Sequence, residues 1–155
     1  MPKYTIKLNA TGPLFTKTGV TERSIRVPTF TADQMKEIGE YDVGLMKDRV
    51  SQLQDVYDRP EPELSPKYAR RKQSKGLPPV RDLFYSGIML SALQILESDE
   101  SHVKIGIKGA VPFRKALFNQ NVDPWFGLSG RDEERLMEEK VRPLFNQNIQ
   151  DLLRG

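Results

Sequence analysis

The sequence predicts an α+β fold in which a small, mostly antiparallel sheet has a long helix packed across it. Two patterns support this fold class. Apolar side chains recur at roughly helical spacing from Met35 to Val56, which indicates one main helix over residues 32–57. Apolar and polar residues alternate over 102–107, as in a half-buried strand. With 155 residues, the chain fits a single domain, 1–155.

An extended N-terminal arm is expected before the main helix. Residues 3–8 alternate apolar and polar side chains and predict a first strand. Several glycines and a proline then interrupt regular structure, so residues 9–30 are expected to form an arm or loop, with a second short strand over 24–27. Such arms often become ordered against a neighbouring subunit.

A basic connector, residues 59–82, follows the main helix. Ser65 and Pro66 are typical of the first residues of a short helix, and Gly76 is placed to end it. Prolines and the residues before them avoid helical backbone angles, so the flanks of this short helix are expected to be extended.

A β-hairpin over 92–108 is the clearest local prediction. A short helical turn leads into its first strand, and the polar segment 98–101 supplies its turn. Just before the hairpin, residues 81–87 are expected to form another helical turn, with Leu83 and Phe84 pointing inward.

The last part of the chain predicts a C-terminal helix over 130–153. Ser129 is a suitable N-cap, and Pro143 is expected to kink or interrupt the helix. A helical turn over 112–118 and an aromatic loop precede it.

Composition narrows the class of protein. Apolar residues make up 37% of the chain and charged residues 29%, which indicates a thin core, long loops, or apolar surface completed by neighbouring subunits. Residues 59–81 carry a net charge of +5 and residues 31–58 carry −4, although the whole chain carries only +3. Alternating blocks suit packing between subunits as well as they suit nucleic acid. The sequence has no apolar run of 18 residues, so no membrane partner is expected.

The sequence offers no catalytic constellation. It has no cysteine and one histidine, His102, so one chain cannot assemble a cysteine–histidine zinc site. It has no glycine-rich phosphate loop and no nucleophile elbow. The carboxylates of 132–134 and 138–139 alternate with basic residues and suit ion pairing along a helix. We expect no enzyme activity, no cofactor and no metal.

The basic residues of the connector are the main candidate interface. They suit a solvated helix face, a contact with an acidic partner or a contact with DNA phosphates. Tyr68 is the one aromatic residue among them, so base stacking with single strands is poorly supported. The candidate residues are Lys67, Arg70, Arg71, Lys72 and Lys75.

Several short motifs follow one another between residues 33 and 140. Their residues are Ser65, Pro66, Tyr68 and Lys72; Leu83, Ser86, Gly87, Leu90 and Ser91; Ile105 and Gly106; Ala116 and Gln120; and Pro124, Phe126, Gly127, Leu128 and Ser129. The order of these motifs resembles tailed-bacteriophage neck and tail-completion proteins, the virion-morphogenesis group that joins head to tail. One departure is Asn119-Gln120, where the group usually has histidine-glutamine followed by glycine.

The resemblance implies a structural protein of the virion neck, made in the host cytoplasm. Its subunits would form a homo-oligomeric ring between the head connector or adaptor and the tail tube or tail terminator, with DNA in the channel as a non-specific contact. Trp125 and Phe126 are then candidate interface residues, although Trp125 suits a core anchor equally well. The alternative is a basic nucleic-acid-binding module that uses Lys67–Lys75, and an uncharacterised enzyme is a more distant one.

Overall fold

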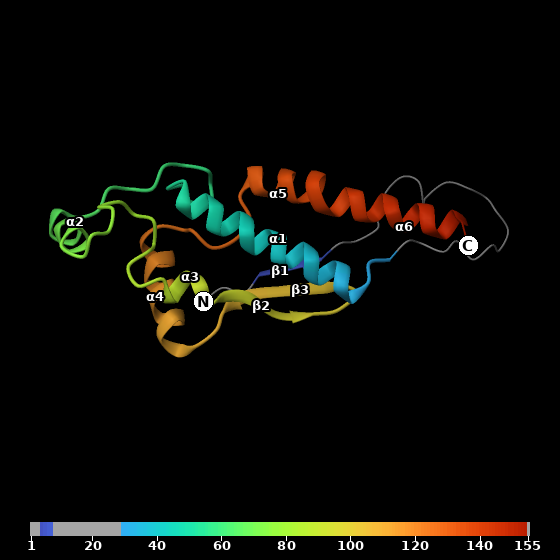
Figure 1. Cartoon of the computed structure of the whole chain (residues 1–155), viewed down its shortest axis with the longest axis horizontal. Coiled ribbons are helices and arrows are strands. Elements are labelled where there is room, and N and C mark those ends of the chain that lie inside the picture. The colour runs from blue at the N-terminus through green and yellow to red at the C-terminus, as the bar shows by residue number, and fades with distance from the viewer. Residues whose placement is uncertain (1–3, 8–28, 155) are drawn as a thin grey trace.

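The computed structural model describes residues 4–7 and 29–154, and the predicted strand over 24–27 lies outside them. The described part of the chain is elongated (Figure 1). In chain order its elements are β1 (Tyr4–Lys7), α1 (Ala32–Ser51), α2 (Pro66–Gln73), α3 (Ile88–Ser91), β2 (Leu93–Ser98), β3 (His102–Ile107), α4 (Ala110–Val122), α5 (Gly130–Leu136), the π-helical segment η2 (Met137–Val141) and α6 (Arg142–Arg154).

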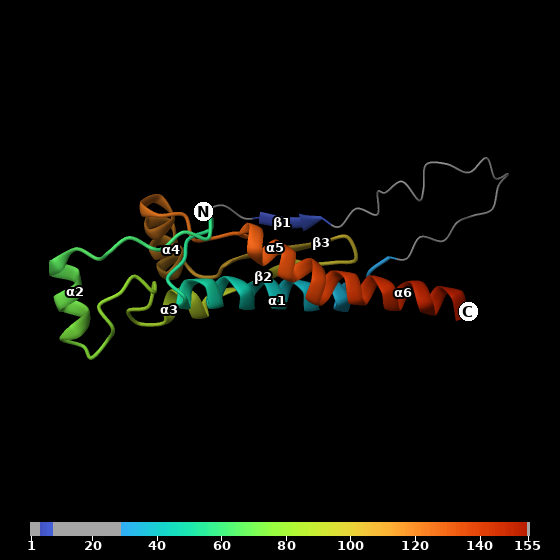
Figure 2. The same cartoon turned by 90° about the horizontal axis from the view of Figure 1, so that it is seen from above.

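The three strands form an antiparallel sheet with the order β1-β3-β2. Ile105 in β3 pairs with Tyr4 of β1 on one side and with Ile95 of β2 on the other. The register of the hairpin shifts between Ile95 and Glu97, as at a β-bulge. Helix α1 packs along β2 and β3 (Figures 1 and 2). The predicted α+β class, with a long helix across a small antiparallel sheet, is therefore confirmed.

The first turn of α1 is closed by a capping box. The Thr31 hydroxyl accepts a hydrogen bond from the Gln34 backbone N–H, and the Gln34 side chain accepts one from the Thr31 N–H. The helix then continues through Gly39 and Gly44 and ends at Ser51, six residues before the predicted end.

A compact loop replaces the predicted last turns of the main helix. Leu53 and Asp58 both have a φ of 58°, which turns the chain away from the helix axis. The Asp55 carboxylate accepts hydrogen bonds from the backbone N–H groups of Tyr57 and Arg59, at 2.8 Å each. The Asp55 carboxylate thus gives these two N–H groups the hydrogen-bond acceptor that backbone carbonyl oxygens would have given them in a continued helix.

Gly39 lets α1 approach the sheet closely. A Cβ atom at this position would lie 2.8 Å from Val103 Cγ1 and 3.1 Å from Ile95 Cδ1. Val103 is fully buried in the central strand. Gly39 is thus a position of close contact between α1 and the sheet.

Apolar side chains form two clusters on either side of α1. One cluster joins α1 to the sheet, α3, α4 and the loop at Trp125 and Phe126. The other joins α1 to α5 and η2 through residues such as Ile38, Leu45 and Leu136. Two neighbouring clusters, rather than one thick core, hold this elongated chain together.

The C-terminal helix is continuous from α5 through η2 to α6. Pro143 is the second residue of α6 and directly follows the π-helical segment, in agreement with the expected disturbance. Proline lacks a backbone N–H, and a wider π turn accommodates the local loss of helical bonding. Helix α6 runs past the N-terminal turn of α1 to the end of the molecule that lies opposite α2 (Figures 1 and 2).

Two local predictions in the middle of the chain need correction. Helix α4 spans Ala110–Val122 and is longer than the turn expected over 112–118. Residues 81–87 form bends rather than a helical turn, and Leu83 has a positive φ of 54°. Phe84, expected to point inward, is 43% exposed.

Candidate docking site at the α2–α4 end

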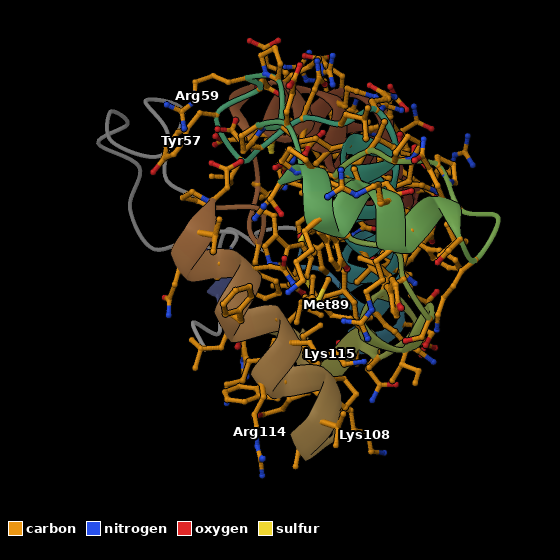
Figure 3. All side chains as sticks on the ribbon, turned by 90° about the vertical axis from the view of Figure 1, so that its left-hand side faces the viewer. Tyr57, Arg59, Met89, Lys108, Arg114 and Lys115 are labelled. Atoms are coloured by element: carbon orange, nitrogen blue, oxygen red, sulfur yellow. The ribbon has the colours of Figure 1, made fainter. Side chains whose placement is uncertain are left out.

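A pocket of about 690 Å³ lies at one end of the molecule, between the connector, α3 and α4. Met89 of α3 lies between α2 and α4 when this end is viewed directly (Figure 3). The lining is largely apolar and aromatic and includes Tyr68, Leu83, Phe84, Met89, Phe118 and Val122. A volume of this size falls in the range of ligand-sized pockets.

Helix α2 forms one wall of the pocket. The Ser65 hydroxyl accepts a hydrogen bond from the Tyr68 backbone N–H, Pro66 occupies the first helical turn, and Gly76 has a φ of 70° beyond the helix end. These local signals are those that the sequence predicted. They place the basic residues of the connector on a short, defined helix.

Lys72 does not belong to the exposed basic surface. It is 1% exposed, and its ammonium donates to the Val80 carbonyl oxygen at 2.7 Å and to Asp82 at 2.5 Å. These bonds fasten α2 to the segment that follows it. Its assignment to the interface is corrected, because a charged group buried with its partners cannot also bind another molecule.

The remaining basic residues of α2 divide into two groups. Arg71 and Lys75 lie over the ring of Tyr85, at 5.4 Å and 4.5 Å from its centroid, and Tyr85 also stacks on Tyr68. Nearby Lys75 lowers the pKa of the Tyr85 hydroxyl. Lys67 and Arg70 are exposed and retain the predicted surface role as a hypothesis.

Trp125 and Phe126 are part of the core. They are 0% and 6% exposed, and their rings meet edge to face with centroids 5.7 Å apart. The Trp125 indole donates to the Ala116 carbonyl oxygen, and Gln120 Oε1 accepts from the backbone N–H groups of both aromatic residues. The core alternative for Trp125 is the one observed, and the interface assignment of both residues is corrected.

A buried arginine joins three segments that the sequence did not bring together. Arg49 of α1 pairs with Asp132 of α5 and donates to the carbonyl oxygens of Trp125 and Gly127 at 2.6 Å and 2.8 Å. Both charged side chains are almost completely covered. The sequence signal for this arginine was its position on the apolar stripe, three residues after Met46.

A second buried charge cluster holds the base of the connector. Glu61 lies 3.1 Å from Arg81, and Asp123 is close enough to affect its titration. Burial, reinforced by the nearby Asp123 carboxylate, raises the pKa of Glu61 to about 8. The cluster connects the loop after α1, the end of the connector and the loop after α4.

Helix α4 extends the positive charge around the pocket. Arg114 and Lys115 are exposed and line it, while Lys108 lies just before the helix. Figure 3 shows Lys108 and Arg114 pointing outward at the lower end of α4. The sequence alone does not single out these residues, because they lie far along the chain from the basic run. The fold brings them to the same pocket.

The described part of the chain shows no group of three or more histidine or acidic side chains able to hold a metal ion. His102 contacts Glu97 and Asp99 beside the hairpin turn. None of the described helices combines the length and hydropathy needed to cross a membrane.

No protein-family model, curated protein or solved structure matches the chain.

Proposed function

We propose that this chain is a structural subunit of the neck of a tailed bacteriophage. It would form a homo-oligomeric ring that joins the head connector to the tail. The observation that carries the proposal is the pocket at the α2–α4 end, where large apolar side chains remain exposed beside basic residues. The sequence resemblance over residues 33–140 supports the same function.

The exposed apolar side chains suit a protein–protein contact. Phe118 is 69% exposed, Val122 52% and Phe84 43%, and all three line one pocket. Isolated apolar residues on a surface need no explanation, but a group around one concavity is typical of an interaction site. Burying them against another subunit would remove apolar surface from water and stabilise the assembly.

The basic residues would steer and orient that contact. Four basic residues are exposed at the α2–α4 end of the molecule. They are Lys67 and Arg70 on α2 and Arg114 and Lys115 on α4. Charges at the rim of an interface raise the association rate and select the orientation of the partner. The mechanism of such a subunit is geometric and involves no chemical step.

Imaging of the chain in virus particles tests this proposal. In purified particles of the virus that encodes it, the chain is expected at the head–tail junction, and mass photometry of the purified ring is expected to give a multiple of the mass of one chain. A mutant virus that lacks the chain is expected to accumulate separate heads and tails. Complete, infectious particles that do not contain the chain would exclude the proposal.

A nucleic-acid-binding module is the second candidate, favoured by the exposed positions of Lys67 and Arg70 on one short helix. A monomer that binds duplex DNA with a steep salt dependence would support it. Replacing Lys67 and Arg70 by glutamate would then flatten the slope of log affinity against log salt by about 0.9 for each phosphate that the protein no longer neutralises. Binding that does not respond to this double substitution would count against the candidate.

A further inference from the structure

Helix α6 carries apolar side chains that the described part of the chain leaves exposed. None of residues 142–154 is buried, and Leu152 and Leu153 are 40% and 82% exposed. In the described part of the chain, Phe145 lies 6.4 Å from Phe30, and the Asn148 amide donates to the Thr29 carbonyl oxygen. Beyond these contacts, Leu152 and Leu153 present an apolar surface that no other described residue buries.

The pocket and this end of α6 lie at opposite ends of the elongated molecule. Figure 1 places α2, α3 and α4 at one end and the C-terminal turns of α6 at the other, and Figure 2 agrees. One copy therefore cannot fill its own pocket with its own α6. Two copies in the same orientation can place these surfaces against each other.

We propose that the last turns of α6 from one copy occupy the α2–α4 pocket of the next copy, which specifies the subunit contact of the proposed ring and rests on that proposed function. The contact is of the helix-in-groove kind, with anchors at helical spacing. Ile149, Leu152 and Leu153 are the anchors, and Phe118, Val122 and Met89 form the apolar floor.

The charges of the two surfaces are complementary. Asp151 and Arg154 flank the exposed leucines of α6. The pocket border provides an opposite charge for each of them, with Lys115 on α4 and Glu63 at the start of the connector. The match favours a second copy as the occupant, because every copy carries both the apolar anchors of α6 and the pocket that receives them. Lys115 would then lie opposite Asp151 and Glu63 opposite Arg154.

The geometry of such a contact determines the kind of assembly. The two surfaces are different parts of the chain, so the interface is heterologous, and repeated contacts close into a ring or continue into a filament. A two-fold dimer would instead bring the same surface of both copies together. The proposal therefore predicts head-to-tail pairing.

Engineered cysteines test this pairing directly, because the chain has no cysteine of its own. Val122→Cys places a thiol in the pocket wall and Leu153→Cys places one on α6. Under mild oxidation, a mixture of these two full-length variants is expected to form the mixed disulfide at least ~10-fold faster than either variant forms a homodimer, since the contact raises the local thiol concentration. The matched control is Glu100→Cys in the exposed hairpin turn, mixed with Val122→Cys.

Disruption of either surface is expected to abolish the preference. Phe118→Glu added to the Val122→Cys variant, or Leu152→Glu added to the Leu153→Cys variant, should reduce mixed disulfide formation to the rate of the Glu100→Cys control. Circular dichroism and urea unfolding check that both added substitutions leave the fold intact, and Phe118 and Leu152 are exposed enough for this to be expected.

The outcomes separate this contact from the function on which it rests. Oligomers of the unmodified chain without preferential mixed disulfide would overturn the contact and leave the ring proposal standing. Faster homodimer formation by Val122→Cys would overturn it in favour of a two-fold interface. A preferential mixed disulfide in a chain that is absent from virus necks would support the contact and refute the proposed function.

Discussion

Alanine at Gly39 and alanine at Gly44 are predicted to change stability in opposite directions. Both glycines lie inside α1, so both substitutions gain the same helix propensity, about 1 kcal/mol. They differ in the space that a Cβ atom would enter. At Gly39 the new atom would lie 2.8 Å from Val103 Cγ1, whereas at Gly44 no other described atom lies within 4 Å.

The magnitude follows from the rigidity of the contacted side chain. Val103 is β-branched and fully buried in the middle strand, so it cannot rotate away at low cost. Overpacking of this kind costs roughly 1–3 kcal/mol, which offsets or exceeds the propensity gain. Gly39→Ala is therefore expected to lower the free energy of unfolding by up to ~2 kcal/mol, and Gly44→Ala to raise it by ~0.5–1 kcal/mol.

Urea unfolding of the two variants beside the unmodified chain measures both effects. Because the propensity term is common, the difference between the variants isolates the contact of α1 with the sheet, expected at about 1–3 kcal/mol. Val103→Ala removes the methyl groups that crowd the new Cβ atom. In a chain that carries Val103→Ala, Gly39→Ala should therefore cost less stability than it costs in the unmodified chain. Equal stabilisation by both alanines would refute the close approach of α1 to the sheet.

Three further predictions concern the buried charges. Burial raises the pKa of Glu61 from 4.5 to about 8, so between these pH values the folded chain binds more protons than the unfolded chain. The free energy of unfolding should therefore fall as the pH rises through this range, by at most ~1.4 kcal/mol per pH unit. Glu61→Gln should remove this slope in urea melts at several pH values. Arg49→Met leaves Asp132 buried without its cation and should cost about 3–5 kcal/mol, whereas Arg49→Met with Asp132→Leu should recover much of it. Lys72→Met removes the partner of the partly covered Asp82 carboxylate and should lower the free energy of unfolding by ~1–3 kcal/mol. Lys67→Met, on the exposed side of α2, should change it by no more than ~0.5 kcal/mol. Thermal unfolding measures both variants, and equal losses would contradict the buried position of Lys72.

The elements that the sequence predicted well are those whose signals are local. The hairpin is defined by alternation within β3 and by a polar turn between its strands, and these signals lie within one short segment, 93–107. The predicted N-caps at Ser65 and Ser129 each accept a hydrogen bond from a backbone N–H three residues further along. A bond between residues so close in sequence forms in almost any tertiary context, so local patterns can predict it.

The candidate interface was predicted less well because exposure is not a local property. Lys67 and Lys72 look alike in the sequence, but the one is exposed and the other buried. The distinction depends on the chain reversing after α2, which brings Asp82 and the Val80 carbonyl to the Lys72 ammonium. For Trp125 the decision depends equally on distant partners.

The sequence by itself thus determined the presence of the main, connector and C-terminal helices, the hairpin and the overall α+β class, because periodicity and capping act over a few residues. Only the tertiary structure decided which charges are buried, where α1 ends and that α4 completes a pocket with the connector. Arg49 and Asp132 are 83 residues apart, and no local pattern specifies their meeting. Burial of a charge is favourable only when its partners arrive together, and that requirement is satisfied by the packed chain as a whole.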